Sequence, residues 1–226
     1  MKKNKILVLI PTKDRLDDFI IFANSWVDTT EGKSDVWVGI DVGDSTYDSI
    51  KYKYPFKYIE ITPKPFLEIL NELAIEGAKE YKYVSFLEDD CIFISKNWES
   101  TFIDKLKSIG DYGIVWGNDL LNKDYIVGLP FMDSKIINVL GYMSPPEIKY
   151  LWADHFWKRI GNTMGTLHYF KDIIIEHRHY STGKRDKDSL SIEVDSKGNA
   201  DYIGFNQHYL GARFDSDIKK LTDAKS

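Results

Sequence analysis

Short apolar runs alternate with helix-like segments through the first half of the chain, and this alternation limits the possible folds most. Residues 6–10 are five consecutive apolar residues, which is typical of a strand buried on both faces. Residues 16–27 then carry apolar side chains at helical spacing. The same reasoning predicts strands at residues 36–40, 58–61, 83–87 and 113–116, and helices at residues 66–79 and 97–108. Such alternation implies βαβ crossovers, so we expect an α/β fold with a mainly parallel central sheet flanked by helices.

The second half of the chain is less regular. Its apolar spacing predicts a short helix over residues 131–140, a helix over 152–160 and a strand at 173–175. Residues 181–200 are polar and rich in Gly, Lys and Asp, so we expect a loop there, followed by a final helix over 202–220. Because neither an internal repeat nor a linker divides the 226 residues, we expect a single domain over residues 1–226.

Composition excludes several classes of protein. The formal net charge of −5 makes a nucleic-acid-binding protein less expected, because such proteins are usually basic. Cys91 is the single cysteine, which rules out a disulfide framework and a cysteine-type zinc site. The N-terminal apolar run is too short for a signal peptide, and no run reaches the length of a membrane span. We therefore expect a cytoplasmic protein without membrane insertion.

Polar clusters follow three of the expected strands, at residues 11–15, 41–45 and 88–90. Ligands of parallel α/β sheets bind at the carboxyl ends of the strands, where these clusters would meet. The last cluster is Glu88-Asp89-Asp90, and three acids would be costly inside a core. Carboxylates suit hard divalent cations such as Mg²⁺ or Mn²⁺. A solvated turn after a strand explains the triplet equally well, so at this point both interpretations stay open.

These segments resemble the GT-A glycosyltransferases, especially the non-processive, family 2-like members. The resemblance is strongest over residues 4–95 and rests on the apolar run with Pro-Thr-Lys-Asp-Arg at 11–15, the strand that ends at Asp41, and Phe-Leu-Glu-Asp-Asp at 86–90. The last segment looks like the family's Asp-x-Asp motif, although Glu88 stands where the family often has Asp. The resemblance implies Asp90 as the main metal ligand and Glu88 or Asp89 facing the ribose or the ion. It also implies that Asp41 contacts the base and that the nucleotide pocket is lined by Pro11, Thr12 and Arg15.

The resemblance also assigns roles in the second half. Asp154, at the start of an expected helix, would be the base that takes the acceptor's proton, although an acid there can also be a simple helix cap. His177 would complete the metal site, with His179 as its competitor, because alternation along an extended chain puts both rings on one face. The alternative is a surface strand end with two unrelated histidines. Arg178, Lys184 and Arg185, in a polar loop, would approach the diphosphate, although three basic residues in such a loop are more often simply solvated.

The resemblance implies a function. It predicts transfer of one hexosyl or pentosyl unit from a nucleoside-diphosphate sugar, by default a UDP-sugar, to an acceptor hydroxyl with inversion, using Mn²⁺ or Mg²⁺. Residues 1–95 would bind the donor. Residues 96–226, with the C-terminal loop and helix, would bind the acceptor, which could be a saccharide, a small molecule or a modified DNA base. The Gln-x-x-Arg-Trp motif of processive synthases is absent.

Other functions are less consistent with the motifs. No Gly-x-Gly-x-x-Gly, P-loop or Gly-x-Ser-x-Gly sequence suggests a dehydrogenase, a nucleoside triphosphatase or a serine hydrolase. Two alternatives remain, namely a sugar-phosphate nucleotidyltransferase and a non-catalytic nucleotide- or sugar-binding domain. The first usually has a Gly-rich segment after its first strand, which this chain lacks. A degenerate acidic motif or a lost base would favour the second, but both the acidic motif and the candidate base are intact here.

Overall fold

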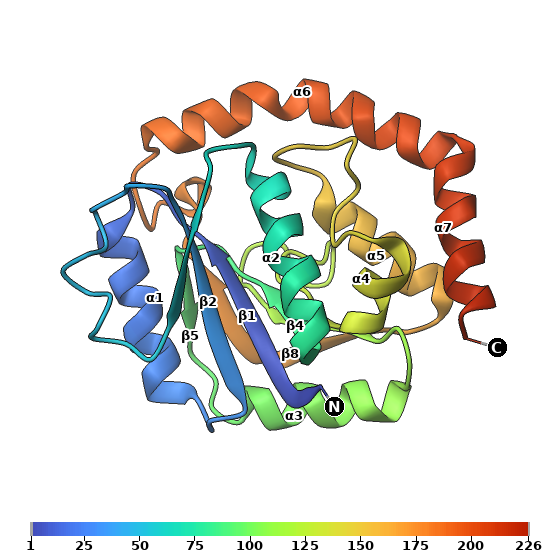
Figure 1. Cartoon of the computed structure of the whole chain (residues 1–226), viewed down its shortest axis with the longest axis horizontal. Coiled ribbons are helices and arrows are strands. Elements are labelled where there is room, and N and C mark those ends of the chain that lie inside the picture. The colour runs from blue at the N-terminus through green and yellow to red at the C-terminus, as the bar shows by residue number, and fades with distance from the viewer. Residues whose placement is uncertain (1, 226) are drawn as a thin grey trace.

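The structure is a computed structural model that describes residues 2–225, and it is built on one eight-stranded sheet (Figure 1). The order across the sheet is β3-β2-β1-β4-β7-β6-β8-β5. The strands are β1 (Lys3–Pro11), β2 (Ser34–Asp41), β3 (Lys57–Ile61), β4 (Tyr81–Phe86), β5 (Cys91–Phe93), β6 (Ile114–Asn118), β7 (Phe131–Asp133) and β8 (Leu167–His177). All the strands expected from the sequence are present, and β5 and β7 are additional.

The first four strands of this order are parallel, as expected from the βαβ pattern. β1 pairs in parallel with β2 and β4, and β2 with β3. The other half of the sheet is mixed, because β7 runs antiparallel to both of its neighbours and β5 runs antiparallel to β8. The carboxyl ends of β1, β2 and β4 therefore meet at one edge, which brings the polar clusters of the sequence together.

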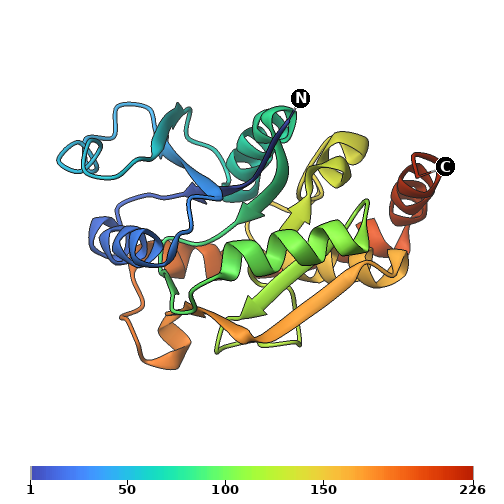
Figure 2. The same ribbon diagram turned by 90° about the horizontal axis from the view of Figure 1, so that it is seen from below.

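Helices cover both faces of the sheet. They are α1 (Leu16–Thr29), α2 (Phe66–Glu80), α3 (Trp98–Ile109), α4 (Ser134–Leu140), α5 (Ala153–Met164), α6 (Ser189–Leu210) and α7 (Ala212–Asp223), with a short 3₁₀ turn at Tyr180–Thr182. Figure 2 shows α3 crossing β6 and β8 on the face that α1 also covers. In the part of the chain that the structure describes, no helix combines the length and the apolar character needed to cross a membrane.

Alternation along β1 explains why both faces carry helices. Ile6 and Val8 belong to the core cluster beneath α1 and α3, whereas Leu7 and Leu9 belong to the cluster beneath α2, α4, α5 and α7. All four side chains are fully buried. At roughly 2 kcal/mol for each buried aliphatic side chain, such a two-sided strand contributes strongly to stability.

Three sequence predictions were wrong in the second half. Residues 131–140 are not one helix, because residues 131–133 pair with β4 and β6 before Asp133 caps α4 by accepting from the N–H of Lys135. Residues 181–200 are not a loop, since α6 begins at Ser189. The expected final helix over 202–220 is two helices, α6 and α7, which meet at Gly211.

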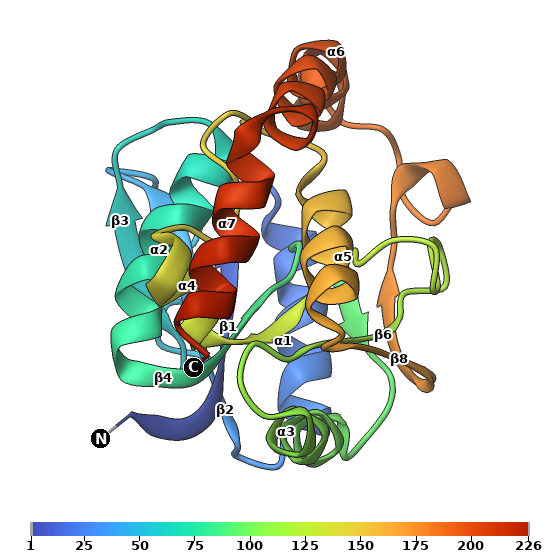
Figure 3. The ribbon, with the colours of Figure 1, turned by 90° about the vertical axis from the view of Figure 1, so that its right-hand side faces the viewer.

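Two carboxylates, the half-buried Asp188 and the buried Asp201, explain why α6 forms despite its polar sequence. Asp188 is its N-cap and accepts from the N–H of Ser191 at 2.8 Å. In the middle of the helix, Asp201 accepts from the backbone N–H groups of residues 149, 150 and 151 at 2.7–2.8 Å. Figure 3 shows the result, with α6 lying across one end of the molecule above α2 and α5.

Candidate functional site

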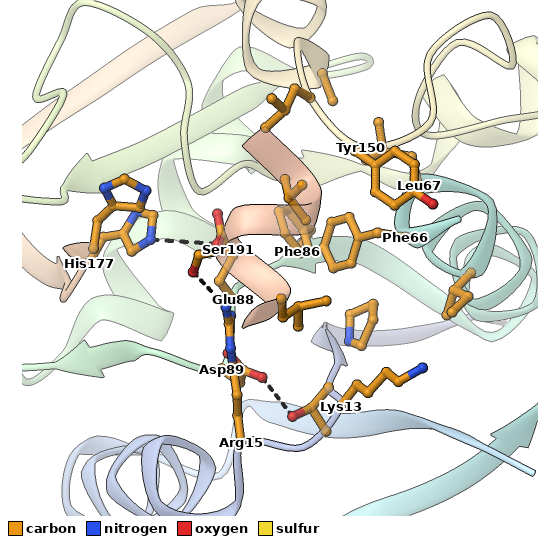
Figure 4. A pocket seen from close by; sticks show the side chains of 18 of the residues that line it. Lys13, Arg15, Phe66, Leu67, Phe86, Glu88, Asp89, Tyr150, His177 and Ser191 are labelled. Carbon is orange, nitrogen blue, oxygen red and sulfur yellow. Dashed lines mark hydrogen bonds and ion pairs between the residues drawn. The ribbon is translucent and has the colours of Figure 1, made fainter. Parts of the chain in front are cut away.

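A cavity of about 500 Å³ opens at the edge of the sheet where β1, β2 and β4 end. Residues of α6 from Leu190 to Asp195 line it as well, so the start of this helix forms its roof. Figure 4 shows His177, Glu88 and Arg15 along one side and Phe66, Leu67 and Tyr150 along the other. Most of the residues predicted for the site line this cavity, namely Pro11, Thr12, Arg15, Asp41, Glu88, Asp89, Asp154, His177 and His179.

The acidic triplet and His177 meet because of how β5 pairs with β8. Cys91 lies opposite His177 in this antiparallel pair, so Asp90 is brought beside the imidazole. Nε2 of His177 lies 3.3 Å from Oδ1 of Asp90 and 3.5 Å from Oε2 of Glu88. Glu88, Asp90 and His177 each offer one ligand atom, and these atoms all lie within 4.8 Å of one another.

The donor atoms of this cluster fit a divalent cation. The side chain of Asp90 is fully buried, and in the described part of the chain neither of its oxygens has a hydrogen-bond partner. His177 Nε2 is likewise buried without such a partner. Oδ2 of Asp90 faces Nε of Arg185 at 2.9 Å, whereas Oδ1 of Asp90 and Nε2 of His177 face each other. Because buried polar atoms are almost always satisfied, these two facing atoms indicate a missing group. Two carboxylates and an imidazole are ligands that Mn²⁺ and similar ions accept.

The charges in this cluster shift the acid–base behaviour of its members. Burial alone would lower the pKa of His177, but Glu88 and Asp90 outweigh burial and raise it well above 6.5. Burial alone would raise the pKa of Asp90, but His177 and Arg185 outweigh burial and lower it. The raised pKa favours the protonated imidazole when no metal is bound, and a metal would have to displace this proton.

Asp89 has a different role from its two neighbours. Its carboxylate accepts from Thr12 Oγ1 at 2.7 Å and pairs with Arg15 Nη1 at 3.3 Å. Burial raises the pKa of Asp89 to about 7, although Arg15 opposes this shift. Thr12 Oγ1 is also 2.8 Å from the hydroxyl of Tyr47. Asp89 thus joins the loop after β1 to the loop after β4, and it lies outside the cluster that could hold a cation.

Arg15 lines the cavity, and its guanidinium is held by protein groups. Its guanidinium spans Asp89 and Asp188, with Nε 2.7 Å and Nη2 3.0 Å from the two oxygens of Asp188, and Nη2 also donates to Ser191. Its donors are directed at protein groups rather than into the cavity. The sequence could not indicate this contact, because Asp188 lies in a segment that was expected to be a loop.

Asp41 lies at the end of β2, as expected, and its partner is Lys13. The ammonium of Lys13 is 3.0 Å from Oδ2 of Asp41, and both side chains line the cavity. Lys13 belongs to the motif that follows the first strand, but sequence reasoning gave it no role. The pair presents a hydrogen-bond acceptor beside a donor at this end of the cavity.

Asp154 lies in the first turn of α5 and lines the cavity. It is not the helix cap, because Trp152 holds the N-cap position with φ +75° and α5 has no side-chain cap bond. Oδ1 of Asp154 instead contacts the N–H and Nδ1 of His155 at 2.7 and 2.8 Å. The left-handed backbone of Trp152 is costly for a large side chain. In this conformation the ring of Trp152 contacts the rings of Tyr202 and Phe205 of α6.

The remaining basic and imidazole side chains separate into two groups. His179 lines the cavity but contacts Ser181 through Nδ1 and is outside the cluster of possible ligands. Lys184 pairs with Glu176 and is not among the residues that line the cavity. Arg185 lines it instead, with Nε 2.9 Å from Oδ2 of Asp90. Arg185, and not its neighbour Lys184, is therefore the basic residue that reaches the site.

Comparisons with known proteins identify the fold. No family model matches the chain, and no curated protein matches it. Among solved structures, S. aureus TarS 1–349 in complex with UDP is 15% identical, with a TM-score of 0.59 over 93% of this chain and 73% of that chain. The mannosyltransferase PcManGT from Pyrobaculum calidifontis, in complex with GDP-Man and Mn²⁺, is 12% identical, with a TM-score of 0.55 over 97% of this chain and 73% of that chain.

A third similar structure is a complex with a saccharide instead of a nucleotide. The catalytic domain of Drosophila β1,4-galactosyltransferase 7, in complex with xylobiose, is 14% identical, with a TM-score of 0.51 over 82% of this chain and 74% of that chain. Against the longer S. aureus TarS structure, the match spans 36% of that chain. At these identities the likeness concerns the fold. The mixed sheet, the helices on both its faces and these neighbours show that the chain has the GT-A glycosyltransferase fold.

Proposed function

We propose that this protein is a metal-dependent glycosyltransferase that moves one sugar from a nucleoside-diphosphate sugar to an acceptor hydroxyl. The observation that carries the proposal is the convergence of Glu88, Asp90 and His177, with unsatisfied buried atoms, beside a cavity that Glu88, His177, Asp41 and Asp154 line. Similar GT-A structures are complexes with UDP, UDP-GlcNAc and GDP-Man, which supports the substrate class.

The donor nucleotide would occupy the side of the cavity formed by the ends of β1 and β2. Asp41 would accept a hydrogen bond from an N–H of the base, and Lys13 would donate to a neighbouring carbonyl. Uracil offers both groups, so a UDP-sugar is the default donor. Pro11 and Thr12 would form the wall beside the base.

The diphosphate would lie next to Glu88, Asp90 and His177. When bound there, a divalent cation would supply positive charge that stabilises the departing nucleoside diphosphate. The protein's own contribution is to hold the three ligand atoms on two paired strand ends, so that little reorganisation is needed. His177 would give up its proton as the site fills.

Asp154 is the proposed base. It lines the cavity, its side chain is about one quarter exposed, and its contacts with His155 fix its orientation in the first turn of α5. A carboxylate in this position could take the proton of the acceptor hydroxyl as the oxygen attacks the anomeric carbon. Attack from the face opposite the leaving group would invert the configuration at that carbon.

The acceptor side of the cavity has aromatic walls. Tyr150, Trp152 and Trp157 line it together with Asp154. Large flat apolar surfaces beside a carboxylate favour an acceptor with a ring and a free hydroxyl, such as a saccharide or a small molecule. A modified DNA base remains a possible acceptor and would require a basic groove for the phosphate backbone.

The test is release of UDP from a panel of UDP-sugars, each with Mn²⁺ and again with EDTA. The proposal expects slow, metal-dependent release through transfer to water, and faster release when an acceptor from a saccharide panel is present. Release of pyrophosphate from UTP and a sugar phosphate would instead identify a nucleotidyltransferase. Donor binding without any turnover of donor in the presence of all acceptors would identify a non-catalytic binding domain.

A further inference from the structure

We propose that Arg185 is a positioning residue that couples the roof helix α6 to the cation site. This inference rests on the proposed function, because it concerns the same cluster of Glu88, Asp90 and His177. It goes further by assigning a role to a side chain that would bind neither donor nor cation. In this role, cation binding and closure of the roof depend on each other, because the guanidinium of Arg185 contacts both Asp90 and the start of α6.

The contacts of Arg185 reach in two directions. Its Nε lies 2.9 Å from Oδ2 of Asp90, inside the site. Its Nη1 donates to Asp188 at 3.1 Å and its Nη2 donates to Ser191 at 3.1 Å. Asp188 is the N-cap of α6 and Ser191 lies in its first turn. The side chain of Arg185 is 9% exposed, so this bridge is made almost entirely inside the protein.

Arg185 leaves a free face of Asp90 for a cation. It approaches Oδ2, whereas Oδ1 is the oxygen near Nε2 of His177. A cation held by His177, Glu88 and Oδ1 can therefore bind while Arg185 keeps its place. Partners that hold a metal ligand through its second atom fix the orientation of that ligand and tune its affinity.

The negative charge of the carboxylates around Asp90 also favours an arginine that keeps its contact with Asp90. Four carboxylates lie along this line of contacts, those of Glu88, Asp89, Asp90 and Asp188, and only two guanidinium groups, those of Arg15 and Arg185, are paired with them. Removal of Arg185 would leave the buried Asp90 with less compensation and with more freedom to turn.

Arg178 provides a matched control on the same segment. Its guanidinium pairs with Asp18 of α1 at 3.3 Å and donates to the backbone oxygen of Lys184, so it also ties this segment to the protein. Within the described residues, these partners include neither Asp90 nor any residue of α6. A variant of Arg178 therefore removes one cation and one tether without touching the proposed link.

The experiment combines two measurements on the full chain, with Mn²⁺ alone as the probe. Paramagnetic resonance of free Mn²⁺ gives the affinity, and amide hydrogen exchange over residues 185–195 gives the order of the roof. In the wild type, we expect saturating Mn²⁺ to slow exchange in this segment. In Arg185→Gln, we expect the affinity to fall by about 10- to 100-fold and the slowing to disappear even at saturation. Arg178→Gln should bind Mn²⁺ within about twofold of the wild type and keep the slowing.

Other variants keep the proposal testable. Asp188→Asn, which weakens the link from the roof side, should also lose the Mn²⁺-dependent slowing and guards against poor folding of Arg185→Gln. Arg185→Lys should not restore it, because one ammonium cannot span two carboxylates as a guanidinium does.

Each contrary outcome has a separate meaning. Unchanged or tighter Mn²⁺ binding by Arg185→Gln, or slowing that persists in it, would overturn the role of Arg185 and leave the proposed function intact. Absence of Mn²⁺ binding by the wild type would overturn the cation site, and the role of Arg185 with it.

Discussion

Oδ1 of Asp90 and Nε2 of His177 lie 3.3 Å apart, although they come from opposite halves of the chain. The pairing of β5 with β8 brings them together, and neither atom has a hydrogen-bond partner among the residues that the structure describes. A buried pair of this kind is stable only if a proton or a cation lies between the two groups. The proposed function depends on this pair, because both residues are proposed cation ligands.

Asp90→Asn should remove metal-dependent binding of UDP. The amide keeps the shape of the side chain but loses the negative charge and one acceptor. Loss of a residue that only supports a metal ligand typically costs about 10- to 100-fold in affinity, so loss of the ligand itself should lower the affinity for Mn²⁺ by more than about 100-fold. Titration calorimetry with UDP and Mn²⁺ measures this loss. Asp44→Asn, on the exposed loop after β2, serves as a carboxylate control. Full metal-dependent binding by Asp90→Asn would show that Asp90 is not a ligand.

Mn²⁺ affinity should rise with pH. The pKa of His177 is raised well above 6.5 because Glu88 and Asp90 outweigh the effect of burial, and only the neutral imidazole can bind a metal. Below this raised pKa the affinity should increase by about tenfold per pH unit, and above it the curve should level off. Measurements between about pH 6 and 9 would show the slope. A flat profile in the wild type would contradict the role of His177, and His177→Ala should flatten it.

The same shift has a consequence for stability without metal. Because the folded-state pKa of His177 is raised, its protonated form stabilises the native state. This contribution is complete below about 6.5, the ordinary histidine value, and disappears as the pH rises through the raised pKa. Urea unfolding of the metal-free protein should therefore show a loss of stability over that range, and His177→Gln should not show it.

Asp154→Asn should separate donor binding from transfer. The residue lies on α5, away from the cluster of possible ligands, so Mn²⁺-dependent UDP binding should stay within about twofold of the wild type. Loss of a general base typically costs about 10²- to 10⁴-fold in rate, and transfer should fall by that amount. The UDP-release assay with acceptor checks the rate. An Asp154→Asn enzyme with normal turnover would exclude this residue as the base.

Arg15→Gln should destabilise the fold. The guanidinium is 11% exposed and holds Asp89 and Asp188, so its removal leaves the buried Asp89 without its charged partner and Asp188 with Arg185 alone. Breaking a buried ion pair from one side costs about 3–5 kcal/mol. Lys79→Gln, which breaks an exposed pair with Glu76, should cost less than about 0.5 kcal/mol. Urea unfolding compares the two, and equal small losses would show that Arg15 is not structural.

The sequence predicted the first half of the molecule well because its signals are local. Continuous apolar runs gave β1 and β2, and helical spacing gave α1 and α2, each to within a few residues of its bounds. The GT-A fold was expected from the motifs at the ends of these strands, and the structural neighbours confirm it. The positions of Glu88 and Asp90 after β4 followed from the same pattern.

Tertiary contacts decided what the sequence could not predict. α6 contains Gly198 and Gly204 and many polar residues, so its local sequence indicates a loop. It forms because Asp188 caps it and because Asp201 accepts from three backbone N–H groups of another segment. The link from Arg185 to Asp90 was hidden for the same reason, since it requires the position of α6 to be known.

The most direct test is titration of the purified protein with UDP, first with Mn²⁺ and then with EDTA. The proposed site of Glu88, Asp90 and His177 predicts binding with Mn²⁺ that EDTA abolishes, and loss of that binding in Asp90→Asn. Equal binding with and without Mn²⁺, or no binding of UDP or of the other nucleoside diphosphates in either condition, would contradict the account.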